Sequence, residues 1–156
     1  MRLHLCAVGR LRAGPERALV DDYARRFDRT GRPLGLGPLT EHEVEDRKGG
    51  GMAAEAELLA RAIPAGAILV VLDERGKTLT SPDLAGQLSR WRDAGRQDCA
   101  ILIGGADGLA PPLRASADLA LSFGPMVWPH MLVRVMIAEQ LYRAATILAG
   151  GPYHRV

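Results

Sequence analysis

The sequence contains little of what marks several common classes of protein. Its two cysteines, Cys6 and Cys99, stand in apolar runs, with no Cys-x-x-Cys pair and no histidine cluster, which argues against a disulfide scaffold and a metal site. We therefore expect buried free thiols and no bound metal. No stretch resembles a signal peptide, and the longest purely apolar run, residues 67–72, is far too short to span a membrane. These absences predict a cytoplasmic protein with no membrane partner.

Aromatic residues and charge of one sign are also scarce. Aromatics make up 4% of the chain, fewer than is usual for a protein that stacks single-stranded bases on aromatic rings. The 20 basic and 18 acidic residues leave a formal net charge of +2, too weak by itself to indicate nucleic-acid binding, although one patch could still be basic. Only Lys48 and Lys77 are lysine, and this excess of arginine indicates a biased base composition in the source genome.

What is present is the composition of an ordinary globular protein. Hydrophobic residues make up 47%, charged residues 24%, and the length suits one domain over residues 1–156. Apolar strands are predicted at residues 3–8, 67–72, 99–103 and 119–123, with a weak strand inside 31–40. Helices are predicted from residue 15 and at 53–63, 81–94 (capped by Ser81), 111–117 and 130–149. This alternation predicts an α/β fold with a mostly parallel sheet.

The block at residues 41–51 is charged and ends in three glycines. Such a composition predicts a mobile surface loop. A loop that touches RNA is the functional alternative.

In an open parallel sheet, ligands bind beyond the carboxyl ends of the strands. Three predicted strand ends are candidates: Leu72-Asp73, Gly104-Gly105 and the loop Phe123–Trp128. The glycine run at 104–108 matches neither G-x-G-x-x-G nor a Walker loop. Its glycines either let the backbone approach a ligand or only make a tight turn between strand and helix.

The last predicted helix is apolar on nearly every face between Met131 and Leu148, with Glu139 and Arg143 spaced for an ion pair. A helix of this kind must be buried on more than one side, which predicts that a second copy of the chain packs on it. Ile137 is expected to face outward, toward that copy. For Arg134 and Arg143, a structural ion pair and a role at the site remain equal alternatives.

The C-terminal tail carries three groups of use in catalysis. Tyr153, His154 and Arg155 supply a hydroxyl, an imidazole that titrates near neutrality and a permanent cation. The alternative is a disordered polar end.

Several segments, in this order and at matching spacing, resemble the bacterial family of ribosomal RNA large-subunit methyltransferases H, within the SPOUT (α/β-knot) superfamily. They are residues 102–108 (LIGGADG), 121–123 (LSF), 129–134 (PHMLVR), 139–144 (EQLYRA) and 152–155 (PYHR). Residues 3–9 and 23–27 are similar to the family as well. The resemblance therefore covers the whole chain.

The resemblance implies a C-terminal trefoil knot, a homodimer, and S-adenosylmethionine bound in the knot as methyl donor. It further implies methylation of N3 of a pseudouridine in helix 69 of 23S rRNA, within the assembled ribosome. The implied cofactor residues are Leu72, Gly104, Phe123, Gly124, Pro125, Met126, Val127 and Trp128. Because Gly124-Pro125 and Val127 depart from the family's usual loop, the backbone there is expected to matter more than the side chains.

Methyl transfer from a sulfonium needs aligned reactants and a deprotonated nucleophile, but no metal. We expect His154 to act as the base, with Tyr153 and Arg155 holding phosphate or base. His130 is expected to cap or pack its helix. A non-catalytic dimeric nucleotide-binding module would use the same loops but give the tail no role, so the position of the tail relative to the ligand pocket distinguishes the two functions.

Overall fold

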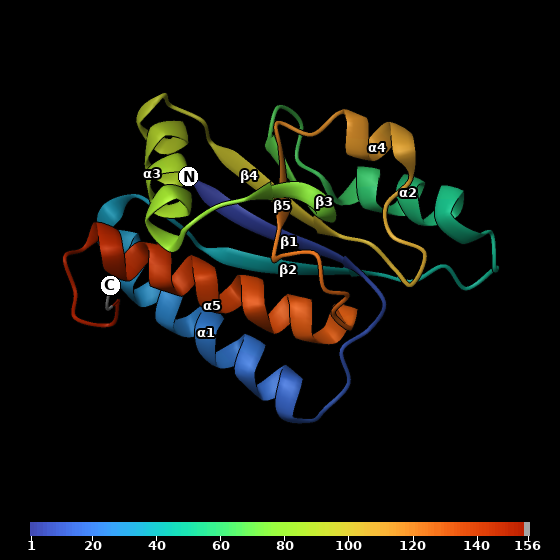
Figure 1. Cartoon of the computed structure of the whole chain (residues 1–156), viewed down its shortest axis with the longest axis horizontal. Coiled ribbons are helices and arrows are strands. Elements are labelled where there is room, and N and C mark those ends of the chain that lie inside the picture. The colour runs from blue at the N-terminus through green and yellow to red at the C-terminus, as the bar shows by residue number, and fades with distance from the viewer. Residues whose placement is uncertain (155–156) are drawn as a thin grey trace.

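A central parallel sheet organises residues 1–154, the part of the chain that the computed structural model describes (Figure 1). Its strands are β1 (Arg2–Val8), β2 (Leu39–Val44), β3 (Ile68–Thr78), β4 (Asp98–Ile103) and β5 (Leu119–Ser122). Within the described residues they form a 5-stranded sheet in the order β2-β1-β4-β3-β5, and each neighbouring pair is parallel. The predicted α/β fold with a mostly parallel sheet is confirmed, and the implied knot stays a prediction.

Helices cover both faces of the sheet (Figure 1). One face carries α1 (Pro15–Gly31), α3 (Ser81–Asp93) and α5 (His130–Leu148), and the other carries α2 (Gly51–Ala62) and α4 (Pro111–Ala115). A short 3-10 helix, Arg32–Leu34, follows α1. Since side chains alternate along a strand, β1 sends Leu3 and Leu5 into the core on one face and Cys6 into the core on the other.

Both cysteines are buried free thiols, as expected. Burial raises the pKa of Cys6 and of Cys99 to about 12, so neither is a nucleophile at neutral pH.

The third helix begins at Ser81, within the predicted range, but its capping residue lies one position earlier than the sequence suggested. Thr80, not Ser81, is the capping residue: its hydroxyl accepts a hydrogen bond from the Asp83 N–H, and the Asp83 carboxylate accepts one from the Thr80 N–H. Ser81 instead donates to Gln140 on α5, at 2.7 Å. The Ser81 hydroxyl thus joins two helices rather than starting one.

The prediction of a mobile loop at residues 41–51 is wrong for its first part. Residues 41–44 belong to β2, which pairs with β1 from Leu3↔Leu39 to Val8↔Val44. The charges of this strand are compatible with a sheet because Glu41 and Glu43 bind arginines of α1 and α5. Only residues 45–50 form a loop, since α2 begins at Gly51.

The expectation that Ile137 faces outward is also wrong. Ile137 is 1% exposed in the single chain. Its neighbours on the inner side of α5 are also buried, because α1, α3 and the sheet pack against them. One chain therefore covers much of the apolar helix that seemed to need a partner. None of the helices in residues 1–154 has the length and apolar character needed to cross a membrane.

Candidate active site

A cavity of about 270 Å³ opens beside residues 72–75, in the middle of β3, and at the carboxyl ends of β4 and β5. It lies where the three predicted strand ends converge. Its lining includes almost all the residues proposed to hold the cofactor, with the exception of Pro125: Leu72, Gly104, Phe123, Gly124, Met126, Val127 and Trp128. The structure thus brings together segments that are about 50 residues apart in the sequence.

The glycine run forms one wall of this cavity as a tight turn. Gly105 and Gly108 make an antiparallel bridge, and the Gly108 N–H donates to the Gly105 carbonyl at 3.0 Å. A Cβ at Gly104 would lie 2.5 Å from the Gly108 carbonyl carbon, so no side chain fits there. The tight turn is therefore real, and it also places bare backbone against the cavity.

Charged residues to which the sequence gave no role also line the cavity. Asp73, directly after the apolar run of β3, accepts from the Arg75 N–H at 2.8 Å and from the Arg114 guanidinium at 3.1 Å. Burial alone would raise the pKa of Asp73, but these donors outweigh it and hold the pKa below its ordinary value. An ionised carboxylate therefore faces the cavity at neutral pH. Its signal in the sequence is an aspartate directly after the continuous apolar run 67–72.

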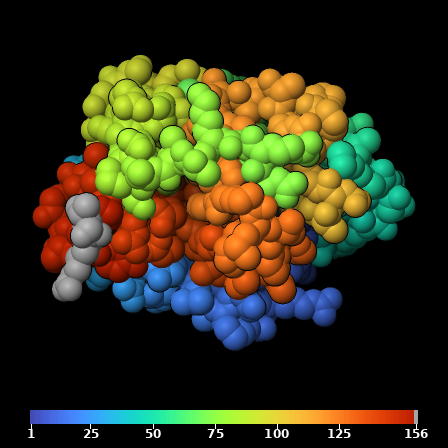
Figure 2. Space-filling model, in the orientation of Figure 1, coloured from blue at the N-terminus to red at the C-terminus, as the bar shows by residue number. Residues whose placement is uncertain are grey.

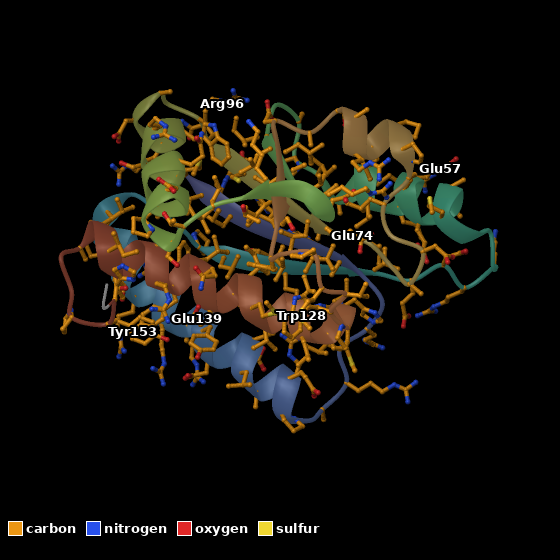
Figure 3. All side chains as sticks on the ribbon, viewed as in Figure 1. Glu57, Glu74, Arg96, Trp128, Glu139 and Tyr153 are labelled. Carbon is orange, nitrogen blue, oxygen red and sulfur yellow. The ribbon has the colours of Figure 1, made fainter. Side chains whose placement is uncertain are left out.

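Large apolar side chains surround the mouth of the cavity on the loop before α5. Val127 is 83% exposed and Met126 is 68% exposed, and Trp128 lies beside them at the start of α5 (Figure 3). These three residues, Met126, Val127 and Trp128, line the cavity and are here called the apolar rim. Further exposed apolar side chains are Leu19 on α1 and Met131 and Leu132 on α5. Figure 2 shows the orange loop region at the surface, between the green end of β3 and the blue α1.

His130, expected to cap or pack its helix, instead lines the cavity. It is the first residue of α5 and is exposed, and its Nε2 lies 4.0 Å from the position of a Cβ on Gly9. An imidazole is therefore available at the mouth of the cavity in the same chain.

Arg134 is buried, and its contacts hold separate parts of the fold together. It is 1% exposed, its Nη1 donates to Glu41 and Glu43 at 3.0 and 2.9 Å, and its Nη2 donates to the Gly9 carbonyl at 3.0 Å. Arg17 also binds Glu41, at 2.6 Å. The network fixes the start of α5 to the ends of β1 and β2, and thereby supports one side of the cavity.

The C-terminal tail folds back along the outer side of α5. The Tyr153 hydroxyl donates to Glu139 at 3.0 Å, and the Tyr153 ring lies 4.6 Å from that of Tyr142 and 4.8 Å from the Arg143 guanidinium. Burial, followed by the contact with Glu139, raises the pKa of Tyr153 well above its ordinary value. Tyr153 is therefore a neutral donor, and Arg143 holds both Glu139 and the tail.

His154 is partly buried, and neither ring nitrogen has a hydrogen-bond partner among residues 1–154. Arg155 lies outside the described residues. Neither Tyr153 nor His154 lines the cavity. Glu139, which Tyr153 contacts, is nine positions after His130 (139 − 130), roughly 13 Å along an α-helix. Figure 3 shows Tyr153 and Trp128 toward opposite ends of α5.

Residues 1–154 match the family model described as predicted SPOUT methyltransferase. The chain is 76% identical to the ribosomal RNA large subunit methyltransferase H of Cereibacter sphaeroides and 69% identical to that of Ruegeria pomeroyi, over 100% of each chain.

Among solved structures, the fold is similar to a probable methylase family protein from Haemophilus influenzae, with a TM-score of 0.53 and 12% identity over 99% of this chain and 70% of that one. A probable methyltransferase from Bordetella pertussis aligns with a TM-score of 0.50 and 18% identity, over 92% of this chain and 96% of that one. These two likenesses concern the fold alone. The match of the family model and the full-length identities show that the chain belongs to the SPOUT methyltransferase family.

Proposed function

We propose that this protein transfers a methyl group from S-adenosylmethionine to N3 of a pseudouridine in helix 69 of 23S rRNA, on the assembled ribosome in the cytoplasm. The observation that carries the proposal is the cavity formed by the three strand ends, in a chain that matches ribosomal RNA large subunit methyltransferases H over its full length. A chain with few aromatic residues, acting as one domain over residues 1–156, suits recognition of a large preformed RNA shape.

The residues of the cavity fit the proposed cofactor. The bare backbone at Gly104 allows a flat ligand to lie close, and the loop from Phe123 to Trp128 offers carbonyl and amide groups with apolar cover. The ionised Asp73 supplies a negative charge that suits a cationic ligand or ribose hydroxyls. When bound, the sulfonium supplies an electrophilic methyl group. The protein's task is then to align the RNA base and to help remove its imino proton.

We propose a homodimer in which the tail of one chain serves the cavity of the other. In the single chain Tyr153 rests about halfway along α5, and neither Tyr153 nor His154 lines the cavity, so these two residues cannot act on a base bound there. The apolar rim around the mouth of the cavity gives a second copy a surface to cover. In this arrangement His154, whose ring nitrogens have no partner among residues 1–154, takes the proton, while Tyr153 and Arg155 position the RNA.

The decisive assay incubates labelled S-adenosylmethionine with ribosomes from a strain that lacks the modification. The full chain should transfer label to 23S rRNA. A chain lacking residues 153–156 should bind S-adenosylmethionine with unchanged affinity and transfer no label, because the tail does not line the cavity. Cofactor binding without transfer by the full chain would contradict the proposal and favour a non-catalytic nucleotide-binding module.

A further inference from the structure

Two loops at the carboxyl edge of the sheet carry cations that the fold itself does not use. The loop after β1, residues 9–14, contains Arg10 and Arg12, and the loop after β2, residues 45–50, contains Arg47 and Lys48. All four side chains belong to exposed residues. Among residues 1–154, Arg10, Arg12 and Lys48 have no carboxylate within salt-bridge distance, and Arg47 has only a long contact of 3.4 Å to Glu45.

Apart from Glu45, which contacts Arg47, the acidic residues of β2 and its following loop are engaged by other groups. Glu41 and Glu43 bind the buried Arg134, so they neutralise an internal charge. The Asp46 carboxylate accepts from the N–H groups of Lys48 and Gly51, at 3.1 and 2.9 Å, and thereby shapes its own loop. Among residues 1–154, Arg10, Arg12 and Lys48 therefore face solvent without an ion-pair partner, unlike Arg17 or Arg143, which have close carboxylate partners.

The two loops lie side by side. The Gly9 N–H donates to the Val44 carbonyl at 2.9 Å, so the loops leave the sheet together. Arg10, Glu45 and Arg47 line one shallow hollow. In Figure 2 the blue loop after β1 reaches the same side of the molecule as the teal and gold segments that follow β2 and β4.

These loops also adjoin the cofactor cavity. Gly9, at the start of the first loop, lies beside His130, which lines the cavity mouth. Figure 1 shows the loops after β1, β2 and β4 at one end of the sheet. An RNA helix whose target nucleotide entered the cavity would therefore pass within reach of these cations.

We propose that Arg10, Arg12, Arg47 and Lys48 form a phosphate-binding surface, here called the basic edge, that holds the RNA backbone next to the target nucleotide. The proposal rests on the proposed function, because it takes ribosomal RNA as the substrate. Lysine and arginine that contact phosphates supply affinity without reading sequence. The recognition of a base by stacking needs aromatic rings, which this chain has in small number.

The test compares two triple variants of the full chain in direct binding to ribosomes that lack the modification, over a series of salt concentrations. The first is Arg10→Gln, Arg12→Gln and Lys48→Gln. The matched control is Arg29→Gln, Arg90→Gln and Arg96→Gln, three exposed arginines that also lack carboxylate partners within residues 1–154 but lie where α1 and α3 end, at the amino edge of the sheet. Both variants lose the same charge.

At about 0.1 M salt, the basic-edge variant should bind ribosomes roughly 10- to 100-fold more weakly, with a slope of log affinity against log salt smaller by about two to three. The control should bind like the unchanged protein. S-adenosylmethionine affinity and melting temperature should stay the same in both. In the methylation assay, KM for ribosomes should rise while kcat is retained.

Equal binding and equal salt slopes for the two variants would overturn the basic edge, even if the unchanged protein methylates ribosomes. Failure of the unchanged protein to transfer label would instead contradict the proposed function. The binding series still decides about the basic edge in that case, because it measures affinity without catalysis. A fall in S-adenosylmethionine affinity in the basic-edge variant alone would also count against the proposal, since it would place these residues in the cofactor site.

Discussion

At Gly104 the backbone of a neighbouring residue occupies the space of a side chain. The sequence suggested that a side chain there would fill the room that a ligand needs. The structure gives a different reason, because a Cβ would lie 2.6 Å from the carbonyl oxygen of Gly108 and so would push the turn apart. The turn over residues 104–108 therefore keeps its shape only if residue 104 has no side chain.

Gly104→Ala should lower S-adenosylmethionine affinity by at least about tenfold and destabilise the fold by about 1–3 kcal/mol, as expected of overpacking. Calorimetry and urea unfolding measure the two effects. Gly86→Ala is the control, because a Cβ at this helical glycine meets only the end of the Arg90 side chain, at 3.6 Å. It should leave affinity unchanged and slightly raise stability. Normal affinity in Gly104→Ala would show that the turn does not support the cofactor.

A second residue-scale feature is the histidine pair on β1 and β2. His4 Nδ1 lies 3.2 Å from His42 Nε2, and His4 Nε2 lies 2.8 Å from Asp98, which Arg2 also binds. Burial, followed by the proximity of His4, lowers the pKa of His42 below its ordinary value. The folded state thus takes up a proton at His42 less readily than the unfolded chain does.

A depressed histidine pKa makes stability pH-dependent in one direction. Above about pH 6.5, the ordinary pKa of histidine, His42 should not lower the free energy of unfolding. Below that pH the free energy of unfolding should fall, because the unfolded state binds the proton first. Urea midpoints at descending pH measure this fall. His42→Gln should reduce the dependence between about pH 7 and pH 5. An unchanged pH dependence in His42→Gln would assign the effect to other groups.

At the scale of elements, β2 is held by long-range ion pairs rather than by its own apolar pattern. Its sequence LTEHEV carries charge on alternate residues, which hides the strand from a reading of hydrophobic periodicity. The partners that neutralise it, Arg17 and Arg134, come from two helices distant in sequence. No local pattern contains this information, so the sequence predicted only a weak strand inside residues 31–40 and missed the extent of β2 over Leu39–Val44.

Arg134→Met should therefore cost about 3–5 kcal/mol of unfolding free energy, because it leaves Glu41 and Glu43 without their buried cation. Hydrogen exchange should quicken first in β2 and in the loop after β1. Arg134→Lys serves as the comparison, since it keeps the charge but loses the fork that reaches both carboxylates and the Gly9 carbonyl. Its free energy of unfolding should lie between those of the unchanged protein and of Arg134→Met. A loss under about 1 kcal/mol in Arg134→Met would contradict a structural role.

At the scale of the whole molecule, the sequence predicted the sheet, the main helices and the convergence of three strand ends, because continuous apolar runs and glycine turns mark them locally. Such local patterns could not predict where the tail packs. The contact of Tyr153 with Glu139 depends on how the chain turns after α5, where the Gly151 N–H donates to the Thr146 carbonyl. The buried inner side of α5 was likewise misread, since periodicity shows that a side is apolar but not which neighbour covers it.

If tail and cavity meet only between two copies, two inactive chains should restore each other. His154→Ala lacks the tail function, and Gly104→Ala, once circular dichroism shows it folded, lacks the cofactor site. Unfolded together and refolded as an equal mixture, they should regain about a quarter of the methylation rate, since about half the dimers are mixed and each has one complete site. At an S-adenosylmethionine concentration too low to fill the weakened Gly104→Ala site, each variant alone should stay nearly inactive. No recovery in a mixture shown to contain mixed dimers would place both functions in one chain.

The strand order also governs how the chain can fold as it is made. β1 is the first strand synthesised, yet it lies between β2 and β4, and its register joins Arg2 to Asp98, 96 positions later (98 − 2). Such non-local pairing makes folding slow, since a long loop must close before the contact forms. At about 5–20 residues per second, the nascent chain spends several seconds before β4 exists. Until then β2, the charged edge strand, is the only one of its two neighbours with which β1 can pair. The central pairing of β1 with β4 therefore forms late.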